Sequence, residues 1–196
     1  MTSPDPKQRL LDAAMDYVAA HGVADFSLRQ LAAALGTSHR MLIYHFGSKE
    51  GLLVEVVRTM EARQHAVFAD LDVALGASPA ELGRALWHRL TDPALAAHER
   101  LFFEMYGQAL QGRAGTTALL DEIIDSWVEP TVASAVAHGM PPADARAHAR
   151  LGLAVTRGLL LDLLTTGDRA GVDAAMELFL ARYEKGWIDA ASAPGG

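Results

Sequence analysis

A short polar segment near the N-terminus carries the residue types best suited to recognising another macromolecule. Arg40 has a planar guanidinium that can donate two parallel hydrogen bonds to O6 and N7 of guanine, the commonest base-specific contact in the major groove of DNA. His39 can donate to a base edge or to a phosphate, and Ile43 offers the apolar surface that a thymine methyl group requires. These residue types at this spacing indicate a surface that could read a base sequence.

Three neighbouring residues could bind phosphate oxygens. Thr37 and Ser38 carry hydroxyl groups at the expected start of a helix, and helix N-termini bind phosphate readily. Lys49 lies in the first turn of the next expected helix, where a positive charge is normally unfavourable, so a nearby anion would explain it. For Arg40 and His39, the alternative is a solvated side chain without a ligand.

Two short helices are expected to position this segment. Residues 27–30 form a capping box that starts the first helix, and Gly36 can end it. The second helix is expected over about 38–46, where Leu42 and Phe46, four residues apart, form its inward face. A helix-turn-helix unit needs this arrangement, with the opposite face of the second helix turned to the major groove. An ordinary helical hairpin is the alternative that the pattern leaves open.

Nearly every other segment also has the signals of a helix. Helices are expected to begin after Asp5, Ser48, Ser78 and Asp92, and three more are expected over about 116–137, 142–165 and 171–188. Pro130 lies inside the first of these three, which predicts a kink near Trp127. No segment alternates with a period of two, and the sequence has no internal repeat. The sequence therefore predicts an all-α fold.

Composition excludes several classes of protein. The 196-residue chain is 51% hydrophobic and contains no cysteine, which excludes a disordered chain, disulfides, thiolate zinc sites and cysteine nucleophiles. Its net charge of −7 argues against a general polyanion binder, although residues 1–50 hold five basic and five acidic residues and are neutral overall. The most apolar stretch, residues 151–164, is too short to span a bilayer, and the N-terminus lacks a secretory signal. We therefore expect a cytoplasmic protein without membrane contact.

Four segments form a more specific pattern than the helix pair alone. They are Ala20-His21-Gly22, residues 26–32 (Phe-Ser-Leu-Arg-Gln-Leu-Ala), residues 35–38 (Leu-Gly-Thr-Ser), and residues 42–53 (Leu-Ile-Tyr-His-Phe-Gly-Ser-Lys-Glu-Gly-Leu-Leu). With these segments, residues 7–53 resemble the N-terminal DNA-binding domain of the TetR family of bacterial transcriptional regulators. The resemblance implies a three-helix DNA-binding domain over residues 1–50 and a helical effector-binding and dimerisation domain over residues 51–189. A disordered tail is expected over residues 190–196.

The function that the resemblance implies is ligand-responsive regulation of transcription. Such a protein binds a palindromic double-stranded DNA operator as a homodimer, acts as a repressor, and is released by a small-molecule effector. No cofactor, metal site or enzymatic activity is expected.

The resemblance implies two further DNA contacts, and it does not imply one from the aromatic residue beside Ile43. Arg29 matches a family position that reaches DNA, with an ion pair to Asp25 as the alternative, and His45 matches a position that contacts phosphate or a base. The family commonly has tyrosine where this chain has Ile43, and the aromatic residue here is Tyr44, at a position that the family often packs against the first helix. We therefore expect no DNA contact from Tyr44.

For residues 51–189 the resemblance implies an effector pocket and a dimer interface without specifying their residues. The candidate residues of the effector pocket are Phe68, Trp87, His88, Phe103, Tyr106 and Trp127. The helices at 142–165 and 171–188 resemble the family's dimerisation helices, and their candidate interface residues are Ala149, Gly152, Leu159 and Leu163. For each aromatic residue, packing in the helical core is the alternative. Asp162, among leucines, is expected either to have a partner or to face the pocket or solvent.

Two other classes of function fit the sequence less well. A helical enzyme or ligand carrier is disfavoured because the chain has no His-Glu-x-x-His, no Gly-x-Ser-x-Gly and no phosphate-cradling glycine loop. A helical interaction module that does not bind DNA would leave Arg40 and Lys49 unexplained.

Overall fold

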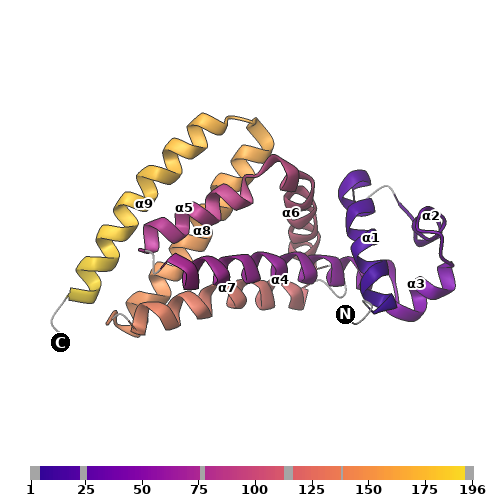
Figure 1. Ribbon diagram of the computed structural model, residues 1–196, viewed down its shortest axis with the longest axis horizontal. Coiled ribbons are helices and arrows are strands. Elements are labelled where there is room, and N and C mark those ends of the chain that lie inside the picture. The colour runs from indigo at the N-terminus through magenta and orange to yellow at the C-terminus, as the bar shows by residue number, and fades with distance from the viewer. Residues whose placement is uncertain (1–4, 23–25, 76–77, 113–116, 138, 193–196) are drawn as a thin grey trace. The chain divides into compact units, whose positions relative to one another are not determined.

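The structure is a computed structural model that describes residues 5–22, 26–75, 78–112, 117–137 and 139–192, with the side chains at 67–75, 117–121 and 187–192 left out. Within these ranges every regular element is a helix, which confirms the predicted all-α fold (Figure 1). The elements are α1 (Pro6–His21), α2 (Leu28–Ala34), α3 (His39–Phe46), α4 (Lys49–Leu75), α5 (Pro79–Leu90), the 3-10 turn η1 (Pro93–Leu95), α6 (Ala96–Leu110), α7 (Thr117–Ala137), α8 (Pro142–Thr166) and α9 (Arg169–Ser192).

Several helices begin at the capping residues that the sequence predicted. The side chain of Asp5 accepts a hydrogen bond from the backbone of Lys7 at the start of α1. Ser27 with Gln30, and Ser78 with Glu81, form the two predicted capping boxes. These bonds satisfy backbone donors that the first turn of a helix leaves without a partner, so the short N-terminal helices have defined beginnings.

Two boundaries differ from the predictions. Asp92 caps the single turn η1 before α6, where a helix was expected to start directly. Helix α9 runs from Arg169 to Ser192, so residues 190–192 are helical rather than disordered, and residues 193–196 lie outside the described part. Helix α7 contains Pro130 and ends at Ala137, as the sequence predicted.

The chain forms two compact units, which are described separately. The first contains residues 1–63 and 97–121, and the second contains residues 64–96 and 122–196. The first unit thus includes the first part of α4 and all but the first residue of α6, whereas the sequence placed a boundary at residue 50.

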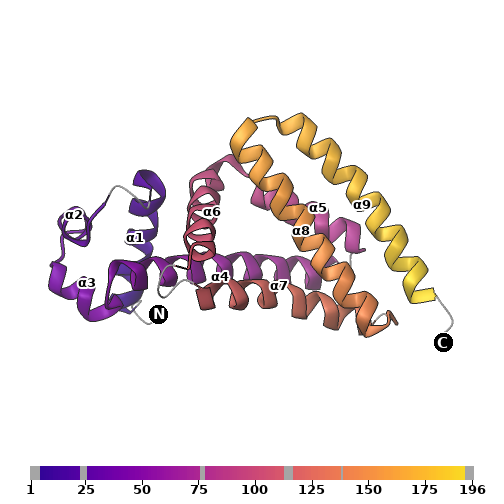
Figure 2. The same ribbon diagram turned by 180° about the vertical axis from the view of Figure 1, so that it is seen from behind.

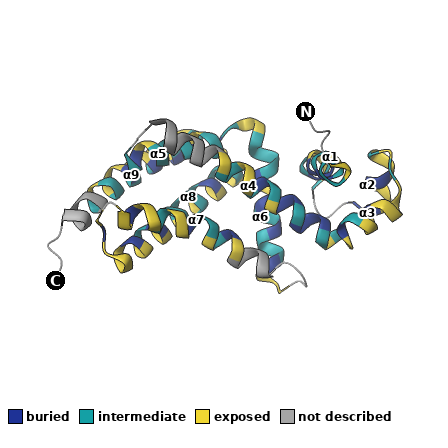
Figure 3. Ribbon diagram, turned by 60° about the horizontal axis from the view of Figure 1, so that its bottom comes forward, coloured by how far each residue is buried: buried dark blue, intermediate teal, exposed yellow. Residues whose placement is uncertain are grey.

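The first unit is held together by the apolar faces of its N-terminal helices. Leu31 of α2, Leu42 of α3 and Leu52 of α4 are fully buried, and Phe46 is also buried (Figure 3). The sequence predicted the inward face of α3 correctly. Ion pairs link α1 to α4: Lys7 Nζ lies 3.1 Å from Glu55 Oε2, and Arg63 pairs with Asp12. Because these charged groups are about half exposed, the ion pairs contribute little to stability beside the buried leucines.

The turn between α3 and α4 brings their backbones close together. Only Gly47 and Ser48 separate the two helices, and Gly47 has a φ of +75°, which glycine adopts without strain. Ser48 Oγ accepts a hydrogen bond from the N–H of Gly51 at 3.0 Å. A Cβ atom on Gly51 would overlap the carbonyl oxygen of Phe46. The missing side chain at Gly51 therefore allows α4 to start directly against the end of α3.

In the second unit α8 and α9 lie side by side, joined by a short turn, and α5 packs on α9 (Figure 2). A Cβ on Gly83 of α5 would lie 2.6 Å from the side chain of Leu180, so glycine permits this close approach. Arg84 donates two hydrogen bonds of 2.7 Å to the carboxylate of Glu177, which ties α5 to α9 again. These contacts fix the position of α9 along α5.

Asp173 is the centre of a second connection between α5 and α9. Its carboxylate accepts hydrogen bonds of 2.7 Å from Trp87 Nε1 and from Arg169 Nε, and Arg169 also donates to the carbonyl of Thr91. Burial acts to raise the pKa of Asp173, but the hydrogen bonds from Arg169 and Trp87 outweigh it and hold the pKa below its ordinary value. The ionised form is therefore the one that the folded chain stabilises.

The Asp173→Asn variant should lower the free energy of unfolding at neutral pH by about 1 kcal/mol, because a charge-assisted pair of hydrogen bonds is lost from a partly exposed site. Since the folded pKa lies below the unfolded value, this contribution is complete above the unfolded pKa and is lost as the pH falls through the folded pKa. Urea unfolding should show a constant difference between wild type and variant at neutral pH, and a smaller one below about pH 4.

The control is Asp162→Asn, which changes an exposed carboxylate on α8 and should have no effect at either pH. If the loss of unfolding free energy in Asp173→Asn stayed constant down to the lowest pH, the hydrogen bonds of Asp173 would not depend on its ionised form, and the prediction would be wrong.

The Gly51→Ala variant should destabilise the first unit by about 1–3 kcal/mol, because the new methyl group meets a backbone carbonyl that cannot move independently of α3. Gly107→Ala is the matched control, since Gly107 is also helical and no atom lies within 4 Å of the place that a Cβ would take there. That variant should be neutral or more stable by up to about 1 kcal/mol, the usual helix preference of alanine over glycine. Thermal unfolding of both proteins measures the difference, and equal behaviour of the two would refute the role of Gly51.

Candidate nucleic-acid interface

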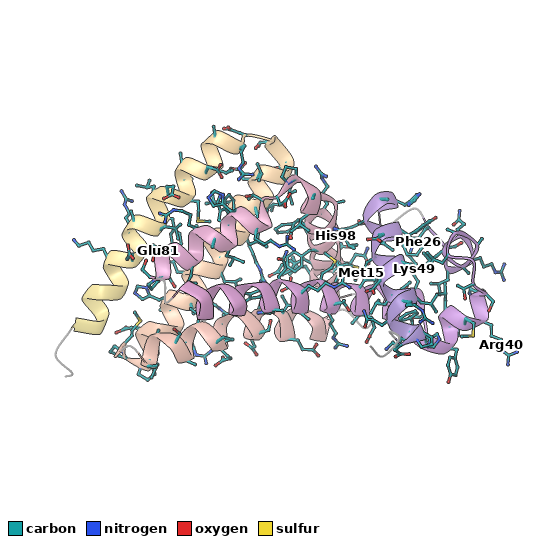
Figure 4. All side chains as sticks on the ribbon, in the orientation of Figure 1. Met15, Phe26, Arg40, Lys49, Glu81 and His98 are labelled. Atoms are coloured by element: carbon teal, nitrogen blue, oxygen red, sulfur yellow. The ribbon has the colours of Figure 1, made fainter. Side chains whose placement is uncertain are left out.

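Helix α3 presents a mixed polar and apolar surface away from the core. Leu42 and Phe46 are buried, and most of the remaining helix is exposed (Figure 3). The exposed residues are His39, Arg40, Met41, Ile43 and Tyr44. The side chain of Arg40 extends away from the helix pair (Figure 4). The structure therefore leaves the predicted base-reading residues Arg40, His39 and Ile43 accessible on one short helix.

The predicted phosphate contacts at the start of α3 have local structural roles as well. Ser38 is the N-cap of α3, and its Oγ accepts a hydrogen bond from the N–H of Met41 at 3.2 Å. Its hydroxyl hydrogen remains able to donate to another acceptor. Thr37 is half-buried and its backbone N–H donates to Ala32. Arg29 is exposed on α2, and its alternative partner Asp25 lies outside the described residues.

Tyr44 is placed differently from the expectation for this position. Its side chain is 78% exposed and does not pack against α1. Successive residues of an α-helix are rotated by about 100°, so Tyr44 lies roughly opposite the inward stripe formed by Leu42 and Phe46. This angular relation was available in the sequence, and it makes Tyr44 an additional candidate for DNA contact.

His45 lies at the boundary between the exposed and buried faces of α3. Its Nε2 atom is buried and has no hydrogen-bond partner within the part of the chain that the structure describes. The ring contacts the ring of Tyr44 at 5.0 Å and that of Phe46 at 6.1 Å between centroids. A DNA contact from His45, as the resemblance implies, would therefore use Nδ1 in this orientation of the ring.

Lys49 is engaged within the domain. Its Nζ donates a hydrogen bond of 2.7 Å to the carbonyl oxygen of Phe26 and lies 4.3 Å from the centroid of the Phe26 ring (Figure 4). From the sequence, a nearby anion was one explanation for a lysine at this place. The structure instead supplies a carbonyl dipole and an aromatic face from the same chain.

The predicted pocket residues are distributed over both units. Phe103 and Tyr106 are half-buried on α6 in the first unit, while Trp87, His88 and Trp127 belong to the second. The side chain of Phe68 lies outside the described residues.

Within the second unit, Trp87 and Trp127 have different environments. Trp87 is buried and bonded to Asp173, which is the environment of a core residue, and His88 is exposed. Trp127 is half-buried, and its ring lies tilted by 31° against that of His65, with 3.8 Å between the centroids. Burial lowers the pKa of His65, which favours the neutral form of its imidazole. Trp127 and His65 form an aromatic and polar pair of the kind that small-molecule sites use.

The small residues predicted for the dimer interface pack inside the chain. Ala149 is buried, and a Cβ on Gly152 would lie 3.3 Å from the hydroxyl of Tyr183 on α9. That hydroxyl donates to the carbonyl of His148 at 3.1 Å, and burial raises the pKa of Tyr183 to about 12. Small side chains permit the close approach of α8 and α9 here, which is a use that sequence alone does not distinguish from an interface with a second chain.

Three leucines elsewhere on α8 and α9 are exposed. Leu159 and Leu163 are half-buried, whereas Leu151, Leu161 and Leu178 are 52%, 45% and 56% exposed. Asp162 is exposed to solvent, one of the alternatives that the sequence left open. The free apolar area of this helix pair therefore centres on Leu151, Leu161 and Leu178.

Two further properties of the described residues bear on other functions. These residues contain no cluster of three or more histidine, aspartate or glutamate side chains that could hold a metal ion. None of the helices in the described ranges combines the length and hydropathy that crossing a membrane requires.

Comparison with known proteins identifies relatives of both the N-terminal segment and the whole fold. Residues 10–56 match the family model of the bacterial regulatory proteins of the tetR family. Over 72 residues the chain is 33% identical to the HTH-type transcriptional regulator SrpR of Pseudomonas putida, a match that spans 37% of this chain and 32% of SrpR. The chain thus aligns with about a third of the length of that relative.

Solved structures match over almost the entire chain. A transcriptional regulator from Rhodococcus sp. Rha1 is similar with a TM-score of 0.77 and 22% identity, covering 97% of this chain and 100% of that one. The multidrug binding protein EbrR, complexed with imidazole, is similar with a TM-score of 0.65 and 29% identity, covering 92% and 96% of the two chains. Residues 10–56 of the chain thus belong to the tetR family of bacterial regulatory proteins, and the fold of the chain as a whole is the one seen in these solved structures.

Proposed function

We propose that this protein is a repressor of transcription that binds a palindromic DNA operator as a homodimer and is released by a small-molecule effector. The observation that carries the proposal is the exposed surface of α3, which lies within the segment that matches the tetR family. A helix whose inward face is fixed by Leu42 and Phe46 can enter the major groove with its other face.

The exposed residues of α3 divide into readers of bases and binders of the DNA backbone. Arg40 binds guanine through its guanidinium, and Ile43 contacts a thymine methyl group. His39, His45 and Tyr44 donate to base edges or phosphates. Arg29, Thr37 and Ser38 bind the sugar-phosphate backbone and set the register of the helix on the duplex. Because residues 1–50 are neutral overall, binding depends on these local contacts more than on a general attraction to polyanions.

Dimerisation follows from the symmetry of the proposed operator. A palindrome requires two copies of α3 about 34–36 Å apart, or a near multiple, which one chain cannot supply. The exposed leucines of α8 and α9 offer apolar area of the kind that a self-complementary interface buries. We place the interface at Leu151, Leu161 and Leu178, beside the half-buried Leu159 and Leu163.

An effector site in the second unit is supported by one relative and one pair of residues. EbrR holds imidazole in its crystal structure, and in this chain the ring of His65, whose Nε2 is hydrogen-bonded to Ser126, lies against the ring of Trp127 and places a polar group beside an aromatic face. Binding of an effector that releases DNA must weaken operator affinity by the same factor by which the operator weakens effector affinity, typically a coupling of about 1–3 kcal/mol.

The Arg40→Ala variant should weaken binding to the selected operator by about 1–3 kcal/mol, because a bidentate contact to one base pair is lost. Binding to random DNA should change little, so the preference for the operator falls at that position. The operator is first selected from random DNA with the wild-type chain, and affinities are then measured by mobility shift. Arg100→Ala removes an exposed arginine of α6 and serves as the charge-matched control, with no change expected. Equal losses on operator and random DNA would refute base reading by Arg40.

The Leu161→Glu and Leu178→Glu variants should each weaken dimerisation by at least about tenfold, because a charge is placed in the apolar centre of the interface. Operator affinity should fall in parallel. Leu110→Glu changes another exposed leucine, at the end of α6, and should leave the protein dimeric. Sedimentation of the three variants tests the placement, and undisturbed dimers of both test variants would show that the interface lies elsewhere.

A further inference from the structure

Phe26 is anchored on two sides at the entrance to α2. It directly precedes Ser27, the N-cap of that helix, and its side chain is 5% exposed. The ring of Tyr17 meets it edge-on with 6.0 Å between centroids, and the ammonium group of Lys49 lies over it at 4.3 Å. Lys49 also holds the carbonyl oxygen of Phe26 by a hydrogen bond of 2.7 Å.

These contacts explain a lysine at an unfavourable place. Lys49 is the first residue of α4, where the helix dipole disfavours a positive charge, and it is half-buried. A carbonyl acceptor and an aromatic face each stabilise an ammonium group that has lost part of its hydration. Phe26 provides both, so the location of Lys49 requires no external anion.

The first turn of α4 thus contacts both ends of the helix pair that carries the candidate DNA surface. Lys49 binds the residue before α2, and the bare backbone of Gly51 lies against the carbonyl of Phe46 at the end of α3. Between these two contacts, α2 and α3 pack on each other. A rigid helix turn that holds both ends of the pair fixes the angle at which α3 faces away from the domain.

We propose that Lys49 is a positioning residue for DNA recognition, which acts by fixing the start of α2 to α4 through Phe26, and is not a phosphate ligand. The proposal rests on the proposed function in one respect, that α3 reads DNA. Its structural part, the control of α2 by Lys49, holds in the free protein and is measured there separately.

Three variants separate positioning from phosphate binding. Lys49→Met keeps the length of the side chain but removes its charge and donors. Lys49→Arg restores a charged donor above the ring. Phe26→Leu removes the aromatic face while leaving every positive charge of the domain in place, so it can disturb positioning but cannot remove a phosphate ligand.

In the free protein, amide hydrogen exchange of α2 is the first measurement. Lys49→Met and Phe26→Leu should each speed the exchange of the Gln30 and Leu31 amides by about tenfold, because loss of the contact favours local opening of α2. Lys49→Arg should restore most of the protection. Lys7→Met is the control, since Lys7 also lies near a phenylalanine ring but bonds to Glu55 of α4, and it should leave α2 unchanged. Unchanged exchange in Lys49→Met would overturn the proposal whether or not the protein binds DNA.

In the DNA-bound state, the salt dependence of affinity is the second measurement. Lys49→Met and Phe26→Leu should each lower operator affinity by about tenfold and leave the slope of log K against log salt unchanged, because no phosphate contact is lost. A slope reduced by about 0.9 in Lys49→Met, with equal loss on random DNA and no effect of Phe26→Leu, would identify Lys49 as a phosphate ligand and refute the proposal. Failure of the wild-type chain to bind any DNA would refute the proposed function alone, since the exchange experiment still decides the role of Lys49.

Discussion

The candidate interface depends on the burial of two side chains from one short helix. Helix α3 has eight residues, and an isolated helix of that length is not stable in water. Leu42 and Phe46 hold it in the core of the first unit, and their burial determines the orientation of every other residue on the helix. Arg40, Ile43 and Tyr44 are therefore exposed as a consequence of packing. The same contacts that stabilise the helix also orient its outer surface.

The second unit uses a different kind of constraint to fix its helices. Leu180 of α9 lies against Gly83 of α5, and side-chain hydrogen bonds between the two helices fix the position of α9 along α5. Asp173 and Glu177, one helical turn apart on α9, bind groups on α5, and Gly83 lets the helices meet closely. With that face of α9 occupied by α5, and the Tyr183 face by α8, Leu178 is left on the outside.

Sequence reasoning was reliable where the signal was local. The capping boxes at Ser27 and Ser78 and the inward stripe of α3 depend on residues three or four positions apart, and the structure confirms them. The bond between Lys49 and Phe26 joins residues 23 positions apart, and no spacing rule indicates it. The expectation that Tyr44 makes no DNA contact came from the position that the family often packs against its first helix, and in this chain Tyr44 is exposed.

The sequence also could not assign a role to residues that suit two different environments equally well. Ala149 and Gly152 permit close approach of a helix, but nothing in their spacing tells whether that helix belongs to the same chain or to another. The same holds for aromatic residues such as Trp87, which suits a pocket or a core until its partner Asp173 is known. The DNA contacts, the effector pocket and the dimer interface accordingly remain predictions.

The division of the chain into two units also separates its chromophores. The three tryptophans, at positions 87, 127 and 187, all belong to the second unit, whereas three of the four tyrosines, at positions 17, 44 and 106, belong to the first. Indole emission excited at long ultraviolet wavelengths therefore originates in the second unit, and tyrosine absorbance is weighted toward the first. The wild-type chain thus has separate optical reporters for its two units. The unfolding of each unit can be followed through its own reporter, without attached dyes.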